Sequence, residues 1–130
     1  MKREKYEEYL RLFNARDYDA LLTFFDDEFE VEFAGYRFTS RQQVRDFYDF
    51  FHAHVEEKIE LQRYLADDET VCLEANVRLT CFRDLPAEAW RERGLERLPA
   101  MTAGQVIEIP QFIHYHLRNG KFRRALCAVR

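Results

Sequence analysis

Two tyrosines and a glutamine are the polar side chains whose positions best suit the binding of a small molecule. Tyr9 belongs to an apolar set with i, i+3, i+4, i+7 spacing, which predicts the buried stripe of a first helix. Gln111 and Tyr115 alternate with aliphatic residues, so they share the mainly apolar face of a predicted strand. A few polar groups in an apolar cavity are what a small-molecule site needs. Alternatively, Tyr9 is a core tyrosine bonded to a neighbour, and Gln111 and Tyr115 form a satisfied internal network.

Cationic and histidine side chains are weaker candidates. Arg63 falls on the predicted pocket side of its strand, where it could hold an anionic ligand group or extend to the rim. His114 and His116 share the opposite face of a strand without a convincing third ligand, so we expect no metal site. His52 and His54 are two residues apart on a helix and point about 200° apart, so they cannot chelate one ion together.

The acidic run after the second helix predicts a strand with one polar face. Alternation places three apolar residues inward and three acids outward, namely Phe29, Val31, Phe33, Glu28, Glu30 and Glu32. Phe33 therefore faces the predicted pocket, and Gly35 ends the strand. The pattern locates no inward carboxylate. Without one there is no positioned general base, a group typically worth about 10² to 10⁴ in rate.

Three helices are predicted before the long strands. Asp17 can cap a short second helix, and Ser40 with Gln43 has the spacing of a capping box at the start of the third. The third helix is the most aromatic segment. We expect Phe47 and Phe51 on its apolar stripe to line the pocket.

Four long strands are predicted in the second half of the chain. Asp67 to Glu69 is expected to be a three-residue turn that pairs Leu65 with Val71 and Leu61 with Ala75. Residues Gln105 to Leu117 and Lys121 to Arg130 should form a hairpin, because Asn119-Gly120 favours a type I′ turn. The connection from Asp84 to Gly104 is longer than hairpins need, which favours a lid, a partner-contacting segment or a flexible protrusion.

Composition is typical of one globular domain spanning residues 1–130. The chain has 47% hydrophobic residues, 15% aromatic residues and a net charge of −4, so no basic nucleic-acid footprint is indicated. Three cysteines without metal spacing favour reduced thiols in the cytoplasm. The charged start and the lack of an apolar run of about 20 residues indicate neither a signal sequence nor a membrane span.

Several segments resemble the nuclear-transport-factor-2-like superfamily, which includes ketosteroid isomerases and SnoaL-like polyketide cyclases. The resemblance is carried by Tyr9 to Leu21, by Asp26-Asp27 leading into the strand, by Ser40 to Tyr48 and by Leu117 to Phe122. It implies a cone-shaped α+β barrel in which three N-terminal helices pack on a curved, mainly antiparallel sheet. It is specific for the fold and does not identify an activity.

The resemblance also implies roles for individual residues. Tyr9 falls where ketosteroid isomerases keep the tyrosine that donates to the enolate oxygen. Their catalytic aspartate falls on Phe33, and their second oxyanion donor falls near Ile113. One of three catalytic positions is kept, so we do not expect plain ketosteroid isomerisation. Neither the inward acid of the cyclases nor the acid triad of limonene-epoxide hydrolases has a match.

Three functions remain open. The protein could be an isomerase-like or cyclase-like enzyme without metal or organic cofactor, using Tyr9 and Tyr115 as proton donors. It could bind a small hydrophobic, polycyclic or carbonyl-bearing molecule without chemistry. It could also be a dimeric interaction module whose cavity its own rings fill. Rings and histidines on the outer sheet face predict a homodimer through that face.

Overall fold

The main structural feature is a curved sheet that does not close on itself. The computed structural model describes all 130 residues. The sheet has the strand order β2-β1-β6-β5-β4-β3. Its strands are β1 (Phe25–Phe33), β2 (Tyr36–Phe38), β3 (Val55–Ala66), β4 (Thr70–Cys81), β5 (Val106–Arg118) and β6 (Lys121–Val129). The helices are α1 (Arg3–Asn14), α2 (Tyr18–Leu22), α3 (Arg41–Phe51) and α4 (Ala87–Glu92). This confirms the predicted α+β class.

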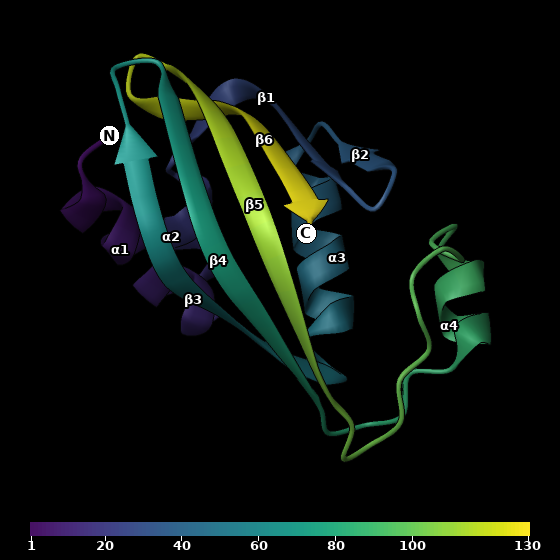
Figure 1. Ribbon diagram of the computed structural model, residues 1–130. Coiled ribbons are helices and arrows are strands. Elements are labelled where there is room, and N and C mark those ends of the chain that lie inside the picture. Colours follow the sequence, from purple (N-terminus) through teal and green to yellow (C-terminus); the bar gives the residue numbers. More distant parts are fainter.

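The helices cover one face of the sheet. In Figure 1, α1, α2 and α3 lie behind the long strands, and no element lies in front of them. Every strand pair is antiparallel except β1 with β6, which is parallel. The apolar residues of the inner face therefore meet the buried stripes of the helices, while the outer face is left uncovered.

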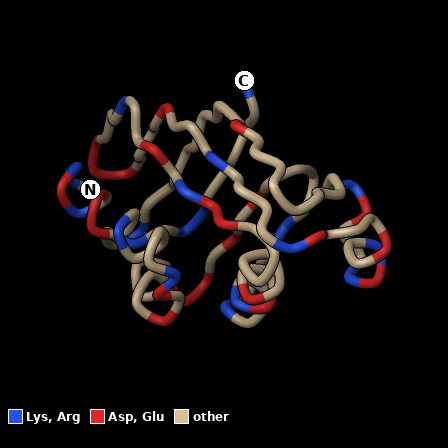
Figure 2. The backbone as a smooth tube through the Cα atoms, turned by 90° about the horizontal axis from the view of Figure 1, so that it is seen from below, with Lys and Arg blue, Asp and Glu red and all other residues tan.

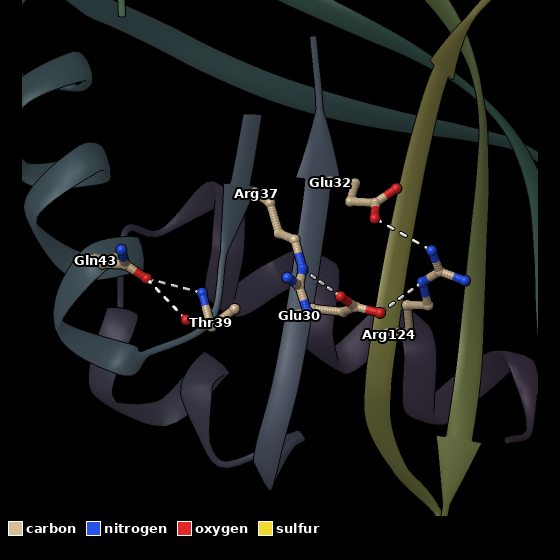
Figure 3. Close-up of polar contacts among 6 residues, drawn as sticks. All are labelled: Glu30, Glu32, Arg37, Thr39, Gln43 and Arg124. Carbon is tan, nitrogen blue, oxygen red and sulfur yellow. Dashed lines mark hydrogen bonds and ion pairs between the residues drawn. The ribbon is translucent and has the colours of Figure 1, made fainter. Parts of the chain in front are cut away.

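Local capping signals start two of the helices as predicted. The Asp17 carboxylate accepts a bond from the backbone N–H of Ala20 at the start of α2. At the start of α3, the Ser40 hydroxyl accepts from the backbone N–H of Gln43, and the Gln43 side chain accepts from the backbone N–H of Thr39 (Figure 3). These bonds satisfy N–H groups that have no partner inside the helix.

The acidic residues of β1 point outward, as the alternation predicts. Arg124 of β6 forms ion pairs with Glu30, from Nε to Oε1 at 2.8 Å, and with Glu32, from Nη2 to Oε1 at 3.1 Å (Figure 3). Arg37 of β2 also pairs with Glu30. These arginines connect the outer faces of three neighbouring strands. The short strand β2, which forms a hairpin with β1, was not among the predicted elements.

A register shift in β3 overturns part of the predicted pairing. Leu61 pairs with Ala75 as expected, but the register then shifts, and Leu65 pairs with Cys72 instead of Val71. Residues beyond the shift exchange faces. Arg63 consequently lies opposite Glu74 on the outer face, so the prediction that it faces the pocket was wrong. Tyr64, expected outside, turns inward and packs against Tyr6.

The predicted final hairpin is confirmed. Strands β5 and β6 pair through Arg118 and Lys121, and Asn119 and Gly120 have φ angles of 53° and 75°. Such positive angles at both central positions suit a two-residue turn whose twist matches that of the strands.

The interior consists of two apolar clusters. One joins α1 and α2 to the strands, and the other surrounds Trp90, which is 1% exposed.

No helix is long and apolar enough to cross a membrane. Figure 2 shows acidic and basic positions interspersed over helices and strands.

Candidate functional site

A cavity of about 550 Å³ lies between α3, the inner face of the sheet and the Asp84–Gly104 connection. Of its 27 lining residues, 23 are hydrophobic. The lining includes aromatic side chains from α1, β1 and α3 and aliphatic side chains from β4 and β5. This lining suits a hydrophobic guest that a few polar groups orient.

Most residues predicted for the site line this cavity. The structure places seven of the eight there: Tyr9, Phe33, Phe47, Phe51, Gln111, Ile113 and Tyr115. Arg63 is the exception, because of the register shift in β3. The alternation of β1 and β5 and the helical spacing of α3 therefore located the wall of the cavity correctly.

The polar residues predicted for the cavity differ in their bonding. The Tyr115 hydroxyl lies 2.9 Å from that of Tyr6, within a buried cluster of rings, so the internal alternative holds for Tyr115 but not for Gln111. Gln111 makes no side-chain hydrogen bond within the protein and has its amide free for a guest. Burial raises the pKa of Tyr9 well above the ordinary value of 10.0, so its phenol keeps its proton at neutral pH.

The expectation that the cavity lacks a carboxylate was wrong. Glu57 of β3 pairs with Leu79, and its side chain shares the inner face with Ile59 and Val77. It is the one carboxylate among the lining residues, and its side chain is 17% exposed. The alternation that placed Ile59 and Leu61 inward extends back to Glu57, so the signal was present in the sequence.

A chain of hydrogen bonds holds Glu57. His52, which caps the C-terminus of α3 and is 3% exposed, places its Nε2 2.9 Å from a Glu57 carboxylate oxygen. Its Nδ1 lies 2.6 Å from the hydroxyl of Tyr18, the first residue of α2. A carboxylate can only accept, so Nε2–H donates to Glu57 and the Tyr18 hydroxyl donates to Nδ1 when the imidazole is neutral. This arrangement was not predicted from the sequence.

Tyr48 is a further polar residue of the cavity that the sequence did not single out. Its ring stacks on that of His52, with centroids 5.0 Å apart, and it makes no side-chain hydrogen bond within the protein. Burial raises the pKa of Tyr48 well above 10.0, and the nearby Tyr9 and Glu57 raise it further. The phenol is therefore a protonated hydrogen-bond donor in the lining of the cavity.

The long connection between β4 and β5 closes one end of the cavity. Arg97, Leu98, Pro99 and Met101 line it, and Trp90 of α4 packs on the rings of α3. The backbone N–H of Arg97 donates to the Tyr36 hydroxyl at 2.8 Å. The segment is thus part of the cavity wall; among the predicted alternatives, this favours a cover over a free protrusion.

Solved structures of low sequence identity share this fold. A candidate polyketide cyclase from Xanthomonas campestris pv. campestris is 22% identical with a TM-score of 0.71, covering 92% of this chain and 82% of its own. A nuclear-transport-factor-2-like protein from Burkholderia pseudomallei is 12% identical with a TM-score of 0.72. The match covers 98% of this chain and 88% of that protein. A candidate ketosteroid isomerase from Kribbella flavida is 14% identical with a TM-score of 0.67, covering 98% and 76%.

Sequence comparison gives the family. No match was found among curated protein sequences. Residues 6–125 match the SnoaL-like domain. This range includes every helix except the first turn of α1, and all of the cavity-lining strands except the end of β6. The chain therefore belongs to the SnoaL-like domain family, within the nuclear-transport-factor-2-like fold.

Proposed function

We propose that this protein binds a small hydrophobic molecule, polycyclic or carbonyl-bearing, in its cavity. The observation that carries the proposal is a cavity of about 550 Å³ with an almost wholly apolar wall and unpartnered polar groups at Gln111 and Tyr48. An apolar body would remove that wall from water, and a carbonyl oxygen would accept from the amide or the phenol.

A second candidate is an acid–base enzyme of the isomerase or cyclase type acting on the same guest. Glu57 favours it, because it supplies the inward carboxylate that the sequence had not located. Tyr9, which also lines the cavity, would donate to the guest's oxygen. The similarity to proteins described as a polyketide cyclase and a ketosteroid isomerase is compatible with this function. Neither metal nor organic cofactor is required for proton transfer of this kind.

We expect steroid-like phenols and dienones to raise the unfolding temperature of the protein. A ligand at 100 times its dissociation constant should stabilise the folded state by about 2.7 kcal/mol. Val77→Phe, which extends a ring into the cavity from β4, should abolish the shift. A thermal-shift panel with both proteins measures this.

The matched control is Lys58→Phe, which places the same ring on the outer face of β3 and should keep the shift. If no apolar ligand stabilises the wild-type protein, the binding proposal fails. If Val77→Phe shifts as much as wild type, the ligand binds elsewhere.

We also propose that the protein is a homodimer through the outer face of the sheet. Leu65 and Phe112 on this face are 73% and 44% exposed, and His114 and His116 lie beside them. No helix covers these strands (Figure 1). Oppositely charged side chains such as Arg78 and Glu108 surround the apolar residues, which suits a self-complementary two-fold contact.

Sedimentation at micromolar concentration should give twice the 15.8 kDa mass of the chain. Phe112→Glu should convert this dimer to monomer, because it buries unpaired charge at the contact. Arg11→Glu, on the exposed side of α1, is the control and should remain dimeric. A wild-type monomer would contradict the proposal.

A further inference from the structure

The lining of the cavity contains one cationic side chain, that of Arg97, which the binding of an uncharged guest does not explain. Arg97 belongs to the connection between β4 and β5 that closes one end of the cavity. Its guanidinium forms neither a hydrogen bond nor an ion pair within the protein, and only its backbone N–H is bonded. A guanidinium has five N–H donors in a planar fork, so these donors are available to a ligand.

Contacts with the turn between β1 and β2 hold Arg97 in place. Its Cζ lies 5.7 Å from the centre of the Tyr36 ring, and its backbone N–H donates to the hydroxyl of the same tyrosine at 2.8 Å. A Cβ atom at Gly35 would lie 2.5 Å from Arg97 Nη1, so a larger residue in the turn would displace the guanidinium. A side chain that is already positioned loses less conformational entropy when it binds a ligand.

The other charged residue of the lining, Glu57, does not neutralise Arg97. Glu57 lies on β3, where its carboxylate is bonded to His52, whereas Arg97 contacts Tyr36 of β2. Strands β2 and β3 are the two opposite edges of the sheet. The cavity therefore has an unpaired positive charge near one edge of the sheet, and a bound anion can neutralise it.

An anion bound to Arg97 would be connected directly to the apolar part of the cavity. Phe33 lines the cavity and packs on Tyr36, with ring centroids 6.2 Å apart. Arg97 itself is exposed, so it lies where the cavity meets water. A carboxylate there would stay partly hydrated and avoid the cost of a fully buried ion pair, while it accepts two parallel bonds from the guanidinium.

We propose that the guest is an amphipathic acid, in which a hydrophobic ring system fills the cavity and a carboxylate binds to Arg97. This inference rests on the proposed binding function and adds the charge of the ligand to it. Arg97 thus takes the role of holding an anionic group that was considered for Arg63, which the register shift in β3 turns to the outer face.

The test compares the binding of 2-naphthylacetic acid with that of its primary amide, 2-naphthylacetamide. The two compounds have the same rings and nearly the same size, but only the acid is charged at neutral pH, because an ordinary carboxyl pKa is about 4. Isothermal titration calorimetry should show that the wild-type protein binds the acid more tightly. Arg97→Gln should weaken binding of the acid about 10-fold and leave the affinity for the amide unchanged, because only the acid loses a charge-assisted pair.

The matched control is Arg91→Gln, which removes the same charge from an exposed position of α4, outside the lining but in the same connection. It should bind the acid like the wild-type protein. Glutamine at position 97 keeps the backbone N–H that donates to Tyr36, so the cavity should remain closed at this end. If Arg97 served only to close the cavity, its replacement would weaken binding of the acid and the amide equally, and that result would overturn the proposal.

The two compounds also distinguish failure of this inference from failure of the proposed function. Equal affinity of the wild-type protein for acid and amide would overturn the role of Arg97 and leave binding in the cavity intact. The same holds if Arg97→Gln loses no more affinity for the acid than Arg91→Gln does. If neither compound binds to the wild-type protein, the result counts against the proposed function and the inference together.

Discussion

Replacing Trp90 by alanine is expected to lower the free energy of unfolding by about 3–5 kcal/mol, the range typical of a large buried aromatic side chain. Trp90 is 1% exposed and packs against Phe50 and Phe51 of α3, with ring centroids 5.3 and 5.5 Å away. Its indole N–H also donates to the Pro99 carbonyl at 2.9 Å. The substitution removes both contacts, because alanine fills little of the space and has no donor.

Urea unfolding followed by circular dichroism measures the change, since Trp90 is the single tryptophan and its fluorescence is lost in the variant. Arg91→Ala, at the next and exposed position of α4, should change the stability by less than about 0.5 kcal/mol. If Trp90→Ala loses less than about 1 kcal/mol, the Asp84–Gly104 segment detaches without unfolding the rest.

Features encoded by neighbouring residues could be predicted from the sequence. The caps at Asp17 and Ser40 and the turn at Asn119-Gly120 each depend on a few consecutive side chains. The wall of the cavity followed from periodicity alone, because Phe33 and Ile113 belong to strictly alternating strands. The resemblance to a known superfamily then supplied the order in which these elements assemble.

The orientation of Arg63 could not be predicted, because it depends on one extra residue in β3. The segment around Gln62 carries neither the glycine nor the proline that often marks a bulge, and strict alternation places Arg63 inward. Beyond the shift, Tyr64 turns inward, packs on Tyr6 and donates to the Met1 carbonyl, contacts that join residues distant in the sequence. Leu65 becomes exposed as a consequence.

The hydrogen-bonded chain of Glu57, His52 and Tyr18 was predictable from the sequence only in part. The inward position of Glu57 follows from the same alternation as that of Ile59, so the sequence pattern is sufficient to predict it. The contact between Tyr18 and His52 joins residues 34 positions apart, so no local sequence pattern predicts it. A histidine at a helix C-terminus is explained equally well by the helix dipole.

Replacing Phe122 by alanine should also lower the free energy of unfolding by about 3–5 kcal/mol. Phe122 is fully buried at the start of β6. Its ring stacks on Tyr115 with centroids 4.2 Å apart and meets Tyr9 and Phe25 at 5.1 and 5.2 Å. The backbone of Phe122 also pairs with β1, so the side chain lies where the parallel pair, the final hairpin and α1 converge.

The control is Phe82→Ala, because Phe82 is 51% exposed and the same atoms are removed from a side chain that is half in water. It should lose less than about 1 kcal/mol in urea unfolding at the same protein concentration. Equal losses in the two variants would show that burial of the ring does not determine how much stability its removal costs. A loss confined to Phe122→Ala, with weaker binding of the hydrophobic panel, would show that the cluster around Tyr115 supports both the fold and the end of the cavity that Tyr9 and Tyr115 line.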